Sequence, residues 1–277
     1  MLNTGGNRAS YSVLLLAMAF TVFCTMTAVT MLGPLLVDMS RGLNTSLPVT
    51  AQLVTASAVA WAVTALVSGP FSDAYGRKPV LMLGAVMVVA GSVGTALAPS
   101  FAIAVGFRLL AGVGGGMIPP TCIAIVGDTF PARRRAMSVA TITMQPGLSG
   151  VIGTPLAAVL GDYAGWRSPF MVIGVAVALA ALALFTLLPH RQPQASGLHL
   201  RERLGHVAAL PLTWYMAGAN LVVRIAFGVI TTFFPAFLLL TYGLRTAQVA
   251  LPVSMVALGA TLGPLVAGRI GSSRPPL

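Results

Sequence analysis

Charged residues are scarce in this sequence. Only 8% of its 277 residues are Asp, Glu, Lys or Arg, whereas about 25% is usual for a soluble domain. Hydrophobic residues make up 57% of the chain, so it has too few polar side chains to cover a water-soluble surface. These shortages exclude an ordinary soluble domain and predict an integral membrane protein.

Histidine and cysteine are equally rare. The three histidines all lie in one polar stretch, and Cys24 and Cys122 lie inside apolar runs, so neither a zinc site nor a disulfide framework is expected. The segment 147–150 has the G-x-S-G form of membrane serine proteases, but a serine nucleophile needs a base in reach, usually a histidine on another span. The motifs H-E-x-x-H and G-x-x-x-x-G-K-[ST] are missing from the sequence. We therefore predict that the chain is not an enzyme and holds no metal or cofactor.

Long apolar runs recur along the whole chain. A helix needs about 20 apolar residues to cross the hydrocarbon core of a bilayer. With Pro, Gly and charged residues as boundaries, we predict eight spans at about 11–37, 49–70, 79–98, 101–127, 136–160, 168–189, 211–241 and 247–268. The prediction is thus an all-α polytopic membrane protein: a six-helix bundle over 1–189, a cytoplasmic linker over 190–210, and two spans of a second bundle over 211–277.

The net charge of +11 predicts a topology. The cations are scattered between apolar runs instead of lining one surface, so nucleic acid is not an expected partner. If the N-terminus is cytoplasmic, inside segments hold eleven cations and outside loops hold three, a strong positive-inside bias. We therefore expect a multi-pass protein of the plasma (inner) membrane with both termini cytoplasmic. The inside cations are Arg8, Arg77, Lys78, Arg133, Arg134, Arg135, Arg191, Arg201, Arg203, Arg269 and Arg274; the outside ones are Arg41, Arg167 and Arg245.

The turn between the second and third spans, GPFSDAYGRKPVL, carries an unusual group of residues. Gly69 and Asp73 are four residues apart on one helix face, where a glycine permits another helix to approach and to meet Asp73. Gly76 suits a positive φ in a tight turn, and Arg77 and Lys78 are positive-inside residues. This G-x-x-x-D-x-x-G-R-K pattern resembles, at every signature position, the motif between the second and third helices of the major facilitator superfamily.

Two further segments strengthen the resemblance. In the fourth span, RLLAGVGGGMIPP is similar to a second family signature at Arg108 and Gly112, although Ala111 stands where the family often has glutamine. The fifth span resembles the glycine-proline pattern of the superfamily's antiporters, although Thr154 separates the usual adjacent Gly-Pro. The matching residues of that span, predicted to pack or bend helices, are Gly150, Gly153 and Pro155.

The resemblance implies a secondary active transporter that rocks two helical bundles about a central site. By this resemblance, a proton gradient is the energy source and the activity is proton-coupled efflux of a drug-like or metabolite small molecule across the lipid bilayer. The first signature is implied to latch the cytoplasmic side. Arg77 would pair with Asp128 at the end of the fourth span, while Asp73 would cap a helix of the other bundle. The alternative for both acids is simple helix-end capping.

Two arginines fall within predicted spans, where an arginine costs about 3 kcal/mol at mid-membrane and usually faces a cavity or a partner. Arg108 and Arg224 are therefore candidates for proton coupling or substrate contact, together with Gly112, Gln145 and Asn220. For Arg108 the alternative is snorkelling outward, and for Arg224 it is burial against a backbone carbonyl. All five acids lie at span ends or in loops, which argues against a dedicated organic-cation site.

Other functions stay open. The family usually has twelve spans, and the last third of that fold is not in this sequence. One alternative is therefore a truncated fragment that does not transport by itself, or that needs a complementary helical fragment as partner. A second alternative is an uptake symporter for a neutral or anionic solute.

Overall fold

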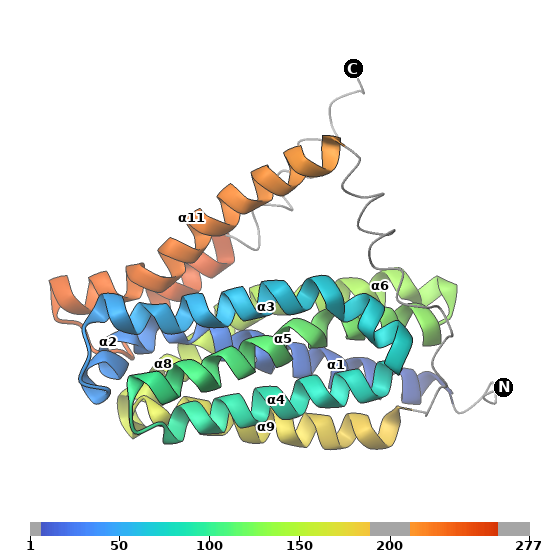
Figure 1. Cartoon of the computed structure of the whole chain (residues 1–277), viewed down its shortest axis with the longest axis horizontal. Helices are drawn as coiled ribbons and strands as arrows, with labels where there is room; N and C mark the ends of the chain where they lie inside the picture. Colours follow the sequence, from blue (N-terminus) through green and yellow to red (C-terminus); the bar gives the residue numbers. More distant parts are fainter. Residues whose placement is uncertain (1–6, 189–210, 260–277) are drawn as a thin grey trace.

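The structure, a computed structural model, describes residues 7–188 and 211–259. All regular elements in these two segments are helices, and five of them are long and apolar enough to cross a membrane. Four of the five are α3 (Leu47–Tyr75), α4 (Arg77–Leu97), α5 (Phe101–Thr129) and α9 (Arg167–Leu187). With the apolar part of α1 they lie side by side in one bundle (Figure 1). The predicted all-α polytopic fold is confirmed.

The first predicted span is two helices instead of one. α1 (Asn7–Thr30) and α2 (Leu32–Gly42) meet at Met31. Pro34 has no N–H to donate to the carbonyl of Thr30, so the helical ladder is interrupted one turn before it. α2 then carries the chain to Gly42, beyond the expected end at residue 37, and brings Asp38 to the end of the bundle.

The fifth predicted span is broken into four segments. They are α6 (Ala132–Thr143), α7 (Gln145–Leu148), a π-helical turn η1 (Ser149–Gly153) and α8 (Thr154–Ala164). Pro146 and Pro155 each remove one backbone donor, which accounts for changes of hydrogen-bond pattern near them. α5, by contrast, continues as one helix through Pro119 and Pro120.

Close backbone contact holds the second, third and fourth spans together. A Cβ at Gly114 of α5 would collide with the carbonyl oxygen of Gly84 on α4, and one at Gly115 would collide with the ring of Trp61 on α3. Small residues permit this approach, and helices in lipid associate mainly through such packing. α9 packs against α4 and α1 on the other side.

After the predicted linker, which lies outside the described residues, α11 (Pro211–Tyr242) runs back along the molecule, and a short helix follows at Ala250–Gly259. Thr232 and Ala236 in the second half of α11 are buried, whereas Trp214 and Val222 in its first half are exposed. Figure 1 shows the reason: α11 lies beside α2 at one end and slopes away from the bundle toward the other. The eighth predicted span, 247–268, is described only as far as residue 259.

Candidate functional site

The turn between α3 and α4 is built around Arg77. Its guanidinium forms an ion pair with Asp73 one turn earlier, donates from Nη1 to Ser72 Oγ, and donates from Nε to Asp128 Oδ2 at 3.0 Å. Asp128 lies in the last turn of α5, so one arginine joins the end of α3 to the end of α5. We call the end of the molecule that holds this cluster the basic end.

The described residues place two further members of the predicted motif. Asp73 pairs with Arg77, and its implied contact with a helix of another bundle stays a prediction. Among the described residues nothing lies within 4 Å of a Cβ built at Gly69, so the expected close helix approach is not found there. Gly76, however, has φ of 95°, a conformation that glycine adopts without steric cost, and it allows α3 to end and α4 to begin at once.

Lys78 also lies at the basic end, with a different partner. Its Nζ donates to the carbonyl of Leu188 at 2.7 Å and lies 4.5 Å from the ring centroid of Phe185. Both partners belong to the end of α9, where unpaired carbonyls attract a cation. The motif's two cations therefore tie the α3–α4 turn to two separate helices.

Arg108 is completely buried between three helices. Its Nη1 donates to the carbonyl of Ala28 on α1 at 3.0 Å, and its guanidinium lies 5.5 Å from the ring centroid of Phe170 at the start of α9. Nε has no hydrogen-bond partner among the described residues, and no described carboxylate forms an ion pair with this arginine. Arg108 thus neither snorkels outward nor lines the hollow described below, and stays a candidate for coupling as an enclosed cation.

The structure places the side chains of two other predicted coupling residues, Gly112 and Gln145, at separate contacts. A Cβ at Gly112 would collide with the carbonyl of Ser57, so this glycine serves helix packing between α5 and α3. Gln145 is buried and its Nε2 donates to the carbonyl of Thr141, 2.7 Å away in the preceding turn. Asn220 and Arg224 lie in α11, and their side chains are outside the described residues.

A partly buried cluster of hydroxyl groups joins the first span to the fifth, and it was not predicted. Thr30 Oγ1 lies 3.1 Å from Ser149 Oγ and accepts a hydrogen bond from Thr154 Oγ1 at 2.6 Å. Ser149 begins the π-helical turn, and such turns recur at functional sites. The sequence signal for this contact is a serine among small residues in the segment 147–150, since serine side chains form hydrogen bonds between closely packed helices in membranes.

The packing glycines of the fifth span face two different helices. A Cβ at Gly153 would collide with Thr27 of α1, and one at Gly150 would lie 2.8 Å from Cβ of Ala257 in the Ala250–Gly259 helix. Ser254 of that helix also donates to the carbonyl of Val151 at 3.2 Å. The fifth span therefore contacts helices on both sides of the predicted linker. Pro155 lies in the first turn of α8, directly after the π turn.

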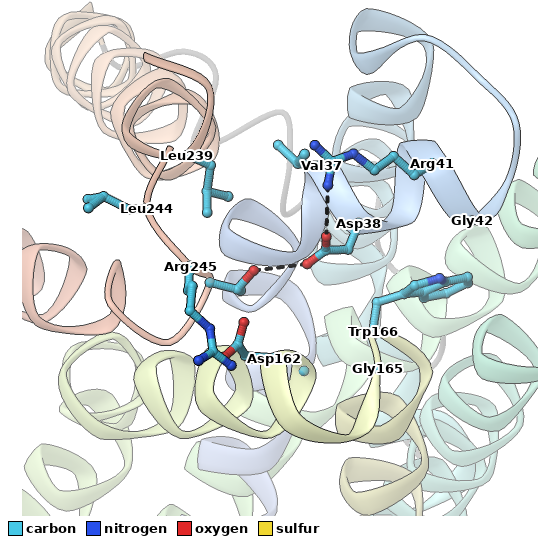
Figure 2. A pocket seen from close by; sticks show the side chains of 12 residues that line it. Val37, Asp38, Arg41, Gly42, Asp162, Gly165, Trp166, Leu239, Leu244 and Arg245 are labelled. Carbon is cyan, nitrogen blue, oxygen red and sulfur yellow. Dashed lines mark hydrogen bonds and ion pairs between the residues drawn. The ribbon is translucent and has the colours of Figure 1, made fainter. Parts of the chain in front are cut away.

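A second charged cluster lies at the end opposite the basic end. Asp38 lies in the second half of α2, Asp162 in the last turn of α8, and Arg245 in the connection after α11 (Figure 2). Thr246 follows Arg245 in that connection. Arg245 Nη2 lies 3.0 Å from Asp162 Oδ2, and Thr246 Oγ1 donates to Asp38 Oδ2 at 2.9 Å. These side chains line a hollow of about 530 Å³ together with Trp166. Sequence reasoning placed the acids at span ends but gave no signal for which cation each would meet.

Neither cluster has the composition of a metal centre. Within residues 7–188 and 211–259, no group of three or more His, Cys, Asp and Glu side chains could hold a metal ion. Both clusters consist of ion pairs and hydrogen bonds that hold helix ends together. Such contacts can break and form again when the helices move relative to one another.

Comparison with protein families matches the chain, over residues 18–277, to the family described as Major Facilitator Superfamily. The chain is 31% identical over 159 residues to the uncharacterized MFS-type transporter YvkA of Bacillus subtilis (strain 168), covering 57% of this chain and 35% of that protein. It is 30% identical over 144 residues to Multidrug resistance protein 3 of the same organism, covering 52% and 27%. It is 27% identical over 256 residues to the probable nitrate/nitrite transporter NarK2 of Mycobacterium tuberculosis (strain ATCC 25618 / H37Rv), covering 89% and 63%. The chain therefore spans less than two thirds of the length of these relatives.

Solved structures show the same fold. A bacterial homolog of the human lysosomal transporter Spinster, in an inward-facing and unoccupied conformation, matches with a TM-score of 0.69 and 20% identity, covering 97% of this chain and 65% of that one. A D-xylose-proton symporter matches with a TM-score of 0.69 and 16% identity, covering 95% and 69%. At these identities the likeness concerns the arrangement of helices alone.

Proposed function

Because the chain belongs to the Major Facilitator Superfamily, we propose that it is a secondary transporter that moves a small molecule across a membrane by alternating access. The family is one of transporters, which confirms the prediction that the chain is not an enzyme. The observation that carries the proposal is the one-sided contact of α11, which is buried at Thr232 and Ala236 and exposed at Trp214 and Val222.

Alternating access requires two helical units that meet at one end while they part at the other. We call α1 to α9 the N-terminal bundle, and α11 with the Ala250–Gly259 helix the C-terminal pair. At the opposite end they are in contact: a Cβ at Gly33 of α2 would collide with the carbonyl oxygen of Thr231 in α11. At the basic end α11 slopes away (Figure 1). This geometry supports a state that is open at the basic end.

We propose that the basic end faces the cytoplasm. The support is the excess of cations in segments predicted inside, which include Arg77 and Lys78 as well as the run 133–135. The Arg77 cluster would keep the ends of α3, α4 and α5 together as one rigid body while the bundle rocks. The structure would then correspond to an inward-open state in the plasma (inner) membrane.

For the cargo we propose a drug-like or metabolite molecule that is exported in exchange for protons. The support is the likeness to Multidrug resistance protein 3 over 52% of this chain and the glycine-rich fifth span, whose π turn contacts both helical units. A turn that is not locked into the α-helical ladder can change its pattern at low cost as those units move.

A second candidate is transport of an anion. The support is the likeness to the probable nitrate/nitrite transporter NarK2 over 89% of this chain, and the burial of Arg108 without a paired carboxylate among the described residues. A buried cation with an unused donor is suited to balancing a negative charge nearby. The lack of carboxylates within the predicted spans fits this candidate as well.

Everted membrane vesicles from cells that produce the protein separate the two candidates. With a proton gradient imposed, export predicts that a neutral drug such as chloramphenicol enters the vesicles and that the drug accelerates proton leakage. Anion transport predicts that nitrate, and not the drug, dissipates the gradient. Vesicles without the protein serve as control, and a gradient that responds to neither solute would contradict both forms of the proposal.

A further inference from the structure

Two carboxylates of the N-terminal bundle bind the same short connection of the C-terminal pair. Asp162, at the end of α8, pairs with Arg245, and Asp38, near the end of α2, accepts from Thr246. Arg245 and Thr246 are adjacent in the connection 243–249, so the two contacts act on one piece of backbone. Figure 2 shows Asp38 and Asp162 reaching it from two different helices.

Asp162 is the more buried of the two acids and therefore has the greater need of a compensating charge. Its side chain is 12% exposed, against 32% for Asp38, and its Oδ2 atom has no aligned hydrogen bond, so the attraction to Arg245 is mainly Coulombic. A carboxylate removed from water needs a compensating charge. If Arg245 moved away, Asp162 would require water in its place, and the hollow between the helices would have to open.

The other cations of this end do not supply that charge. Arg41 lies three residues after Asp38 on the same helix, is 74% exposed, and reaches Asp38 only at 4.0 Å. Arg167 donates to the carbonyl of Ala98 and lies 4.2 Å from the ring centroid of Trp166. Among the described ion pairs, the one that crosses from the C-terminal pair to the N-terminal bundle is Arg245 with Asp162.

We propose that Arg245 and Thr246 form a latch on Asp162 and Asp38 that keeps this end closed while the basic end is open. In this proposal the four residues are positioning residues that set the balance between the two states of the cycle. The inference rests on the proposed alternating access. It predicts that opening of this end breaks both contacts, since both belong to one connection.

A cysteine in the hollow tests the latch without any transport assay. Val37 lines the hollow and is 5% exposed, so a Val37→Cys protein in nanodiscs reacts slowly with a maleimide while the latch is closed. Asp162→Asn or Arg245→Gln is expected to raise the labelling rate about fivefold, the factor that corresponds to a loss of about 1 kcal/mol. Thr246→Val, which removes the donor and keeps the shape, is expected to raise it about twofold.

Two controls make the result specific. Arg41→Gln removes a cation from the same end without crossing between the two units, and it should leave the rate within about 1.5-fold of the parent. Exchange of the charges in Asp162→Arg with Arg245→Asp should return the rate toward that of the parent. If the charge-exchanged protein does not fold, the three single variants still test the latch, because the labelling rate of each is compared with that of Arg41→Gln. The protein without Val37→Cys gives the background from Cys24 and Cys122, which are both buried.

The latch is overturned if Asp162→Asn, Arg245→Gln and Thr246→Val all label at the parent rate, or if Arg41→Gln accelerates labelling as much as they do. Transport is measured separately in vesicles. Vesicles that move no solute, together with accelerated labelling of the variants, would refute the proposed function and leave the latch standing. Active vesicles with unchanged labelling would refute the latch and leave transport standing.

Discussion

Removing the Arg77 guanidinium should loosen the ends of three helices at once. Arg77 is 23% exposed, and its carboxylate partners Asp73 and Asp128 are 22% and 35% exposed, so water screens the pairs only in part. A fully exposed ion pair contributes about 0.2 to 1 kcal/mol, and a hydrogen bond to a charged group about 1.5 to 3 kcal/mol. We expect Arg77→Ala to lower the free energy of unfolding by about 2 kcal/mol.

The share that belongs to Asp128 can be isolated with a double-mutant cycle. Asp128 is reached across the helix ends, whereas Asp73 lies in the turn just before Arg77. We expect Arg77→Ala and Asp128→Asn to be non-additive by about 1 kcal/mol, because the ion pair between the two residues is lost in either single variant and cannot be lost a second time in the double variant. Arg133→Ala changes an exposed cation near the same end and serves as the matched control, with an effect under about 0.5 kcal/mol.

Thermal unfolding in detergent with a thiol-reactive fluorophore provides the measurement. Cys24 and Cys122 are 2% and 0% exposed, so they react only when the bundle opens. With about 2 to 4 °C of midpoint per kcal/mol for a chain of this size, Arg77→Ala should lower the midpoint by about 4 to 8 °C. Additive effects of Arg77→Ala and Asp128→Asn, or an equal loss in Arg133→Ala, would refute the role assigned to this pair.

The same assay checks three further expectations. Gly114→Ala should lower the unfolding midpoint, because the new Cβ would collide with the backbone of α4. Gly106→Ala on the same helix places its Cβ in open space and should stabilise the protein by about 0.5 to 1 kcal/mol. The reverse order of midpoints would contradict the packing of α4 on α5. Thr30→Val removes the central member of the hydroxyl cluster and should lower the free energy of unfolding by about 1 to 2 kcal/mol. Thr143→Val, at an exposed site, should change the midpoint little. Equal losses of midpoint in the two variants would show that the cluster does not stabilise the protein. Arg108→Lys should lower the midpoint more than Arg108→Met, because it buries a strongly hydrated ammonium without a carboxylate. A lower midpoint in Arg108→Met than in Arg108→Lys would mean that the protein compensates the positive charge at this position.

Much of the candidate site could be read from local patterns. The turn at Gly76 follows from a glycine between two apolar runs, and its φ of 95° bears out that prediction. The contact of Arg77 with Asp128 requires only that two helix ends lie at the same side of the membrane. In the structure Arg77 Nε donates to Asp128 Oδ2 at 3.0 Å. Such contacts can be predicted because the hydrophobic thickness of the bilayer places span ends at common levels.

Other features depended on how helices face one another. The sequence placed Arg108 within a span, but only the packing of α1, α5 and α9 decided that it is enclosed and bonded to Ala28. Gly69 matched a packing motif, yet no described helix covers it. The division of the fifth span by η1 was also not predicted, because prolines indicate lost donors without indicating which hydrogen-bond pattern replaces them.

The sequence by itself determined that this chain is helical, lies in a membrane, and has its cations concentrated at one predicted side. These properties follow from composition and from the spacing of apolar runs, which every stretch of the chain carries locally. Only the tertiary structure decided that Asp162 meets Arg245 and that Asp38 meets Thr246, residues 83 and 208 positions apart along the chain. The physical reason is that a partly buried charge requires a partner wherever it lies in the sequence. Which residue becomes that partner depends on which helix ends the packing brings together.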